Sequence, residues 1–250
     1  MLVQLINYYG VSPEKVSIEE FKHYLYDCKE NRGLSTSFIN QAISALKILR
    51  EDVLGLSWDG SLKIKRPRRT HDLPEVLSKQ EAITLIEVLP NPKHEAILAL
   101  LYSTGMREEL LNLRLCDIDS TRMVIRIIHG KGNRSRDVLL SERALRLLRT
   151  YYTSSRPKPI KYVFESWQPG HPYSASSVLK LVKRAAKRAG IKKKVHPHSL
   201  RHAFATHMLE QGVNLKRIQQ LLGHSSLRST MIYLHLAAID PSVKSPFDLP

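Results

Sequence analysis

The chain of 250 residues is poor in cysteine, in aromatic side chains and in long apolar runs. Two cysteines, Cys28 and Cys116, cannot form a disulfide framework, and they lack metal-ligand spacing, which favours a reducing compartment. The longest apolar run, residues 96–102, is far shorter than the roughly 20 residues that cross a bilayer. The N-terminus, MLVQLINYYG, has no basic region ahead of an apolar core, so no signal peptide is predicted. We expect a soluble cytoplasmic protein with no membrane partner.

Acidic residues are also scarce relative to basic ones. Lys and Arg number 39 against 23 Asp and Glu, which gives a net charge of +16 and a pI near 9.9. Residues 1–70 carry a net charge of +3, and residues 71–250 carry the other +13. A charge of this size predicts a polyanionic partner, and nucleic acid is the first class to consider. The length allows one large or two modest domains.

Reactive side chains gather in the stretch 195–236. His198 and Arg201 are three residues apart, so a helix would place them on one face, and Pro197 is tolerated in a first helical turn. An imidazole and a guanidinium beside a helix N-terminus suit an anion such as phosphate. The same pair is also common on a solvated helix face, so the spacing alone leaves both interpretations open.

The rest of this stretch predicts two further helices that fold back over the first. A second helix is expected over 215–222, and a third carries Tyr233. The stops and caps that separate the helices are Gly212, Asn214 and Gly223. This arrangement would bring His224 and Tyr233 towards His198 and Arg201. Phosphate binding then becomes the favoured interpretation.

Three motifs in the stretch carry a family resemblance. The sequence reads HSLRHAFATH from residue 198, LLGHSS from 221 and TMIY from 230, and this ordered set resembles the signature of the tyrosine recombinase, or phage integrase, family. Upstream, the arginine of LLYSTGMR resembles the family's first catalytic arginine, and the lysine of GKGNRSR resembles its hairpin lysine. The resemblance implies six catalytic residues: Arg107, Lys131, His198, Arg201, His224 and Tyr233.

The resemblance implies a site-specific DNA recombinase that needs neither metal nor cofactor. Tyr233 would attack a DNA phosphate and become a 3′-phosphotyrosine, while Arg107 and Arg201 hold the phosphate oxygens with help from His224. Lys131 would protonate the leaving 5′-oxygen, and His198 would accept the tyrosine proton. The implied partner is double-stranded DNA, bound by a homotetramer on two sites at the nucleoid, with no small-molecule substrate.

The resemblance also implies a fold class and a domain order. We expect a mostly α fold with a small antiparallel β-sheet, in two domains. A helical core-binding domain would span 1–56, shortened at its N-terminus, and a catalytic domain would span 76–236. Residues 57–75 would be a linker, and a tail at 237–250 would dock on a neighbouring protomer. The linker is predicted to follow the DNA backbone through Lys63, Lys65, Arg66, Arg68 and Arg69, although a merely solvated loop is the alternative.

Local patterns place the secondary structure in more detail. Capping residues and apolar periodicity predict helices over 17–27, 36–53, 79–88, 92–103, 141–151 and 174–189. Strands are predicted over 123–128, 136–140 and 161–165, the first two joined by a turn at 129–133.

A second basic cluster lies between residues 183 and 194, which contain no acidic residue. We predict that it contacts duplex DNA, and a solvated helix face is the alternative. Its members are Lys183, Arg184, Lys187, Arg188, Lys192, Lys193 and Lys194.

One departure from the family pattern affects Arg107. The family pattern has an acidic residue three positions after this arginine and before two leucines, whereas here Glu109 follows after two. A deletion in a helix turns the following residues by about 100 degrees. Either the break at 104–105 absorbs this shift, or the protein has lost catalysis and only binds DNA. A topoisomerase of type IB is a third reading, and LLGHSS favours the recombinase. A zinc site at His196 and His198 is rejected because no ligand partner lies at suitable spacing.

Overall fold

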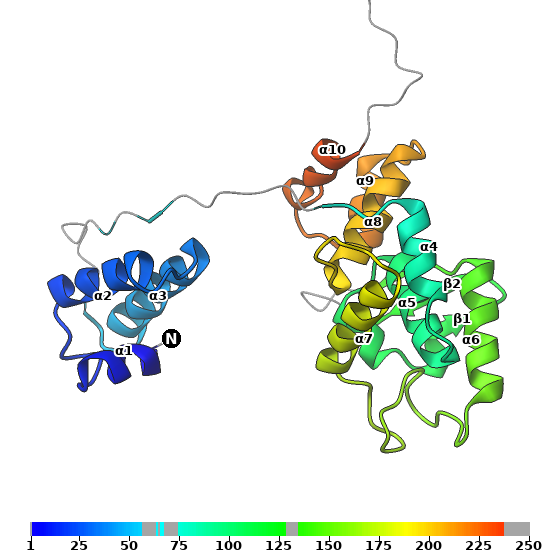
Figure 1. Cartoon of the computed structure of the whole chain (residues 1–250), viewed down its shortest axis with the longest axis horizontal. Helices are drawn as coiled ribbons and strands as arrows, with labels where there is room; N and C mark the ends of the chain where they lie inside the picture. The colour runs from blue at the N-terminus through cyan, green and yellow to red at the C-terminus, as the bar shows by residue number, and fades with distance from the viewer. Residues whose placement is uncertain (1, 57–63, 65, 68–74, 129–134, 238–250) are drawn as a thin grey trace, which may run out of the picture. The chain divides into compact units, whose positions relative to one another are not determined.

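The computed structural model describes residues 2–56, 64, 66–67, 75–128 and 135–237. Contacts divide the chain into two compact units, Met1–Asp72 and Leu73–Pro250, each with its own core. Helices predominate in both units, as Figure 1 shows. None of the described helices is long and apolar enough to cross a membrane.

The first unit is built from three helices, and serine caps fix the starts of the second and third. They are α1 (Leu2–Tyr9), α2 (Ile18–Glu30) and α3 (Thr36–Ile48), and a π-helical turn, Leu49–Val53, continues α3. Ser17 Oγ accepts the N–H of Glu20 at 3.2 Å, and the Glu20 carboxylate accepts the N–H of Ser17 at 2.7 Å. Ser35 Oγ accepts the N–H of Phe38 in the same way. The predicted helices are confirmed, although α2 ends three residues beyond the predicted Asp27.

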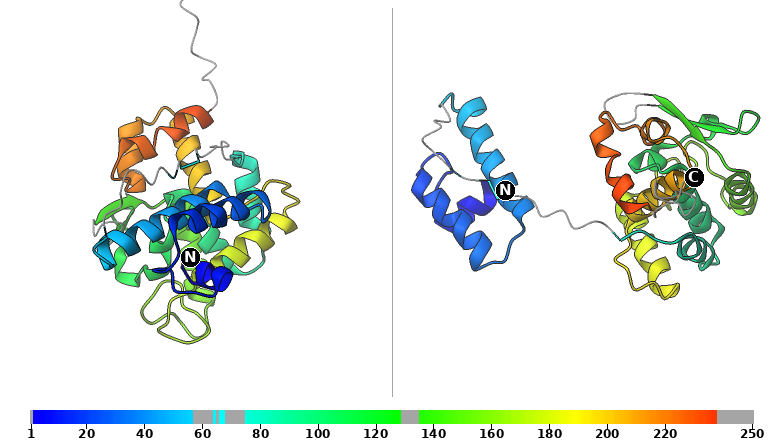
Figure 2. Two further views of the ribbon diagram at one scale, coloured as in Figure 1. Left: turned by 90° about the vertical axis from the view of Figure 1, so that its left-hand side faces the viewer. Right: turned by 90° about the horizontal axis from the view of Figure 1, so that it is seen from above.

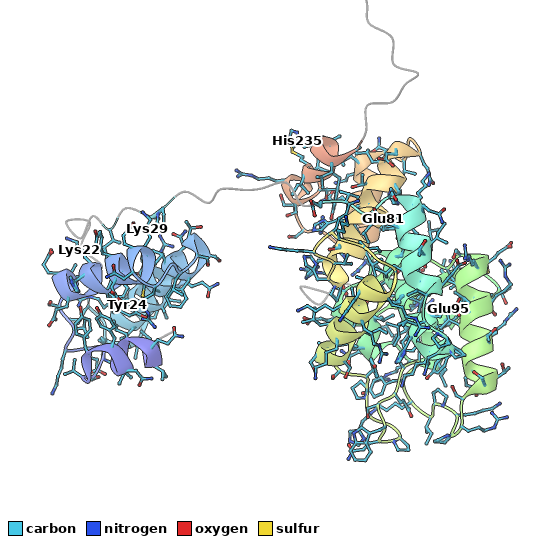
Figure 3. All side chains as sticks on the ribbon, viewed as in Figure 1. Lys22, Tyr24, Lys29, Glu81, Glu95 and His235 are labelled. Atoms are coloured by element: carbon cyan, nitrogen blue, oxygen red, sulfur yellow. The ribbon has the colours of Figure 1, made fainter. Side chains whose placement is uncertain are left out.

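The core of this unit lies between α2 and α3. Tyr24, which Figure 3 labels on α2, packs there with Phe21, Ile39 and Leu46. The predicted apolar face does not continue to Val53, whose side chain is 68% exposed, because the π-helical turn changes the helical register after Ile48.

Part of the predicted linker lies along α3. Ile64 packs against the core of the first unit. Nη1 of Arg66 donates to the carbonyl of Asn40 at 3.2 Å and to Oγ of Ser44 at 3.1 Å, and Nδ2 of Asn40 donates to the carbonyl of Pro67 at 3.2 Å. These contacts fix the backbone near Arg66 to a helix. Lys63, Lys65, Arg68 and Arg69 lie outside the described residues.

The second unit is organised around helix α5 (Pro92–Thr104). Oδ1 of Asn91 accepts the N–H of Lys93 at 2.9 Å, and Pro92 occupies the first turn, so the predicted start is confirmed. The helix is buried from residue 96 to residue 101. It packs against α4 (Lys79–Glu87), α6 (Glu142–Ser154), α7 (Ala175–Arg188) and α8 (Pro197–Glu210), as Figure 1 shows.

A small antiparallel sheet covers another part of the core. Its strands run in the order β1 (Ile118–Asp119), β2 (Val124–Ile127) and β3 (Arg136–Leu139). Figure 2 shows the strands of this sheet side by side. In the register of β2 and β3, Val124 lies opposite Leu139 and Ile127 lies opposite Arg136. Both predicted strands of this hairpin are confirmed. The sequence did not predict β1, because two residues are too short to show an alternating pattern.

The predicted strand at 161–165 is wrong. Within it, only isolated pairings form, between Arg114 and Tyr162 and between Glu165 and Pro172. Oε1 of the buried Glu165 accepts the N–H groups of Ile160 and the next two residues, between 2.7 and 3.2 Å. The backbone therefore turns around its own carboxylate instead of extending.

The last helices follow the predicted caps and stops. Gly212 and Gly223 adopt φ values of +79° and +66° at the ends of α8 and α9 (Leu215–Leu222). Asn214 caps α9 by accepting the N–H of Lys216 at 2.7 Å. A short helix, α10 (Ile232–Leu236), then carries Tyr233 into a cluster with α8 and α9. The three predicted helices of this stretch are confirmed.

Candidate active site

Arg201 joins three segments of the second unit. Its guanidinium, on α8, donates from Nη1 to the carbonyl of Gly105 at 2.6 Å and from Nη2 to the carbonyl of Leu222 at 2.7 Å. Arg201 is only 4% exposed. The two carbonyls end α5 and α9, so the position of this guanidinium is set by both helix ends. Two of its five N–H groups are used in this way.

Gly105 allows the end of α5 to lie close to α8 and α9. It adopts a φ of +62°, and a Cβ there would lie 2.6 Å from Cδ1 of Phe204 and 2.8 Å from Cδ2 of Leu222. A side chain at residue 105 would therefore push the end of α5 away from α8 and α9.

Tyr233 lies against Arg201. The tyrosine is 2% exposed, and this burial raises the pKa of its hydroxyl. The charges of Arg201 and Arg107 oppose that rise. Burial lowers the pKa of Arg201 to about 10, so the guanidinium still carries its charge at neutral pH. The two predicted residues are thus brought together, with a phenol beside a fixed cation.

His198 stands at the start of α8. His196 caps this helix, since its Nδ1 accepts the N–H of Ser199 at 3.2 Å. Burial, followed by the charges of Arg107, His196 and Arg201, lowers the pKa of His198. Because the ordinary pKa of histidine is already below 7, the His198 imidazole is neutral at neutral pH and can accept a proton.

Arg107 belongs to a non-helical segment. The backbone of Arg107 has φ −114° and ψ −128°, which is not helical. Arg107 lies between the αL residue Gly105, which ends α5, and a 3-10 helix, Glu108–Asn112. Its exposed side chain and that of His198 line a cavity of about 740 Å³. The predicted helical rotation of 100 degrees does not apply here, because no α-helix continues through Arg107.

His224 occupies the turn after α9. Its Nδ1 lies 2.9 Å from Oγ1 of Thr230, which is fully buried. Nε2 of Gln219 donates to the His224 carbonyl at 3.0 Å. This turn begins directly after Leu222, whose carbonyl is bound by Arg201. The sixth predicted catalytic residue, Lys131, lies outside the described residues.

The second basic cluster is mostly exposed. Helix α7 buries one apolar face and leaves the four basic residues of its last turns exposed, namely Lys183, Arg184, Lys187 and Arg188. Lys192 and Lys194 are also exposed. Lys193 differs, because its Nζ lies 2.6 Å from Oε2 of Glu81 and 2.9 Å from the Val76 carbonyl. Glu81 is labelled on α4 in Figure 3.

Several residues near the site were not assigned a role from the sequence. His202 was expected to pack, and its ring lies 5.7 Å from that of Tyr233, centroid to centroid. Burial, followed by nearby positive charges, lowers the pKa of His202 to about 4. Glu109 accepts the N–H of Arg107 at 2.8 Å, and Thr230 contacts His224. The spacing of residues in the sequence predicts neither of these contacts. In the part of the chain that the structure describes, no group of His, Cys, Asp and Glu side chains could hold a metal ion.

Comparison with known proteins decides the family. Residues 75–239 match the sequence profile of the phage integrase family. The chain belongs to the phage integrase family. The resemblance drawn from the HSLRHAFATH, LLGHSS and TMIY motifs is therefore confirmed, and the protein is a tyrosine recombinase by descent.

Individual relatives of this tyrosine recombinase cover most of its length. The putative integrase/recombinase y4qK of Sinorhizobium fredii is 36% identical over 97% of this chain and 79% of that protein. The tyrosine recombinase XerD of Staphylococcus saprophyticus is 32% identical over 90% of this chain and 79% of its own.

Two solved structures share the fold of this tyrosine recombinase. The XerA recombinase, at 31% identity, covers 96% of this chain and 84% of its own with a TM-score of 0.61. The XerH recombinase bound to its palindromic difH substrate has a TM-score of 0.73 at 23% identity, covering 92% and 71%. The predicted class, mostly helical with a small antiparallel sheet, is confirmed.

Proposed function

We propose that this protein is a site-specific DNA recombinase that cuts and rejoins duplex DNA through a 3′-phosphotyrosine. The observation that carries the proposal is the contact between Tyr233 and the buried guanidinium of Arg201. A nucleophile held against a fixed cation is what attack on a phosphodiester requires, since negative charge develops on the phosphate oxygens.

The reaction is an exchange of phosphodiester bonds. The Tyr233 oxygen forms a bond to phosphorus, and the bond from phosphorus to the 5′-oxygen breaks. The tyrosine proton passes to His198, and Lys131 supplies a proton to the leaving 5′-oxygen. In the reverse direction a 5′-hydroxyl, from the same or a partner strand, attacks the phosphotyrosine. One phosphodiester replaces another, so the cycle needs neither a nucleotide cofactor nor a metal.

The cationic residues have different tasks. Arg201 keeps three N–H groups beyond the two that bind the Gly105 and Leu222 carbonyls, and these can hold a non-bridging phosphate oxygen. Arg107, exposed at the cavity, would bind the phosphate from the other side. His224, held by Thr230, would add a hydrogen bond as charge develops.

The non-helical backbone at Arg107 favours an active enzyme over a DNA-binding protein that has lost catalysis. The charge of Arg107 acts on the pKa values of His198, Arg201 and Tyr233, which supports its place in the site. Insertion of one residue after Arg107 tests this choice. A tolerated register predicts no gain or a loss of cleavage, whereas a large gain would indicate that the shortened turn had impaired the enzyme.

The proposed substrate is double-stranded DNA, and the exposed basic face of α7 supplies a surface for its phosphates. We infer a homotetramer on two DNA sites at the nucleoid, with a core-binding domain at 1–56, a linker at 57–75 and a catalytic domain at 76–236. The tail at 237–250 would dock on a neighbouring protomer. Deletion of that tail is expected to leave binding by a single protomer intact and to impair pairing of two sites; unchanged recombination would contradict the proposed docking.

The test is a trapped covalent complex. Duplexes that bind Tyr233→Phe are first selected from random sequence and then prepared with a nick that lets the 5′-fragment diffuse away. The unmodified protein is expected to become linked to the 3′-phosphate of the cut strand. Tyr233→Phe is expected to bind the duplex without forming a covalent bond. Linkage by the Tyr233→Phe variant would refute the assignment. Equal linkage on unselected duplexes, with relaxation of supercoils, would favour the topoisomerase reading.

A further inference from the structure

Arg136 is a largely buried arginine to which the proposed chemistry gives no role. It is the first residue of β3, two residues after the undescribed segment of the hairpin. Its side chain is only 12% exposed. Nε donates to the Leu221 carbonyl at 3.1 Å, and Nη2 donates to Oε1 of Glu109 at 3.1 Å. The guanidinium therefore binds groups of the protein itself on two sides.

Glu109 extends this contact to Arg107. While Oε1 binds Arg136, Oε2 accepts the backbone N–H of Arg107 at 2.8 Å. Burial by itself would raise the pKa of Glu109, but the charge of Arg136 and backbone N–H groups outweigh it and lower the pKa. The carboxylate is thus ionised at neutral pH and bridges the end of the hairpin to the segment that carries the first arginine.

The other end of the guanidinium meets the turn that carries His224. The carbonyls of Leu221 and Leu222, at the end of α9, are bound by Arg136 and Arg201 respectively. Gly223 follows with a φ of +66°, and a Cβ there would lie 2.7 Å from Nη1 of Arg136. The arginine thus lies directly against the backbone from which His224 projects.

We propose that Arg136 is a positioning residue that fixes the Arg107 segment and the His224 turn relative to the β2–β3 hairpin. The proposal rests on the proposed function, since the aligned groups matter for phosphodiester exchange. One ionised pair therefore connects the backbone segments that carry Arg107 and His224, and a displacement of roughly 1 Å at such groups costs on the order of 100-fold in rate.

The experiment compares Arg136→Gln, Arg136→Lys and Glu109→Gln with the parent protein. Arg146→Gln is the matched control, because Arg146 is an arginine of α6 whose side chain is 67% exposed. Covalent complex formation on a nicked duplex is followed in single turnover at saturating DNA, and DNA affinity is measured separately. Hydrogen exchange is followed in peptides covering 105–112 and 219–226.

We expect Arg136→Gln to slow the covalent step by about 100-fold with little change in DNA affinity. Arg136→Lys should recover part of the rate, because one ammonium can serve Glu109 or Leu221 but not both geometries. The double variant Arg136→Gln with Glu109→Gln should be no slower than Arg136→Gln, because the two residues act as one unit. Exchange should rise in both peptides, although neither contains the substituted residue of Arg136→Gln.

A parent rate and unchanged exchange in Arg136→Gln would overturn the proposal. Faster exchange throughout residues 75–237 in both Arg136 variants would also overturn it, because the residue would then support the whole fold. A parent protein that forms no covalent complex on selected duplexes would refute the proposed function instead. In that case the exchange in the two peptides still decides whether Arg136 fixes the two segments.

Discussion

Tyr233 and Arg201 lie beside each other in a site where neither residue is more than 4% exposed, and the charge of the guanidinium opposes the rise that burial causes in the pKa of the tyrosine. The two residues come from α10 and α8, and both also pack against or bond to the end of α9. Burial raises the pKa of the tyrosine, so its hydroxyl is protonated at neutral pH, and in the proposed reaction a base must accept its proton.

Arg201→Lys is expected to remove most of the covalent step. A lysine ammonium cannot serve the Gly105 and Leu222 carbonyls and a phosphate oxygen with the geometry of a planar fork. We expect a fall of at least about 100-fold in single-turnover cleavage, together with a loss of stability of roughly 1–3 kcal/mol from unpaired carbonyls. Denaturant unfolding measures the second effect. A variant with parental cleavage would show that the arginine does not bind the phosphate.

Gly105→Ala is expected to destabilise the second unit more than Gly190→Ala. Both glycines have positive φ values, +62° and +68°, so backbone strain is similar. Only at Gly105 does a Cβ meet other atoms, at 2.6 Å from Phe204, whereas nothing lies within 4 Å at Gly190. The extra cost should be roughly 1–3 kcal/mol, as for other overpacked sites. Equal unfolding midpoints for the two variants would contradict the close approach of α5 to α8.

The burial of His202 is expected to lower the free energy of unfolding in acid. Its folded pKa of about 4 lies below the ordinary value, so the unfolded chain binds the proton more tightly. The neutral His202 ring therefore contributes to the free energy of unfolding in full above about pH 6.5, and this contribution is lost as pH falls from about 6.5 towards 4. His202→Gln should therefore lose less stability than the parent between pH 7 and pH 5, measured by denaturant unfolding. His171→Gln is the control, because His171 is exposed. If His202→Gln and the parent protein lost stability equally between pH 7 and pH 5, the burial of a neutral imidazole at residue 202 would be contradicted.

The basic run at 183–194 is expected to divide into two kinds of residue. Lys187→Gln, on the exposed face of α7, should reduce the salt dependence of DNA binding by about one ion. Lys193→Gln should leave the salt dependence unchanged and lower stability, because its ammonium binds Glu81 and the Val76 carbonyl. Affinities over a range of salt concentrations measure the first effect. An equal change of slope in both variants would contradict this division.

The sequence predicted the fold where local signals were strong. Capping residues such as Ser17, Asn91 and Asn214 mark helix starts, and Gly212 and Gly223 mark helix ends, because these positions have specific backbone requirements. The strand predicted at 161–165 failed because the side chain of Glu165 competes for the local backbone N–H groups.

The candidate site was predictable only in part. The motifs supplied the residue types, and the family match confirms the origin of those motifs. The contacts of Glu109 and Arg136 were not predictable, because they join residues 27 positions apart through tertiary packing and leave no periodic signal. The consequence of the short turn after Arg107 was likewise not decided by helical geometry, since the backbone there is not α-helical.

The most direct test of the proposed chemistry is the nicked-duplex experiment with the parent protein and Tyr233→Phe, followed by peptide mapping of the trapped complex. We expect a covalent complex whose DNA-linked residue is Tyr233, joined to a 3′-phosphate, and no such complex with Tyr233→Phe. A DNA link mapped to any other residue, or an equal yield from Tyr233→Phe, would contradict it.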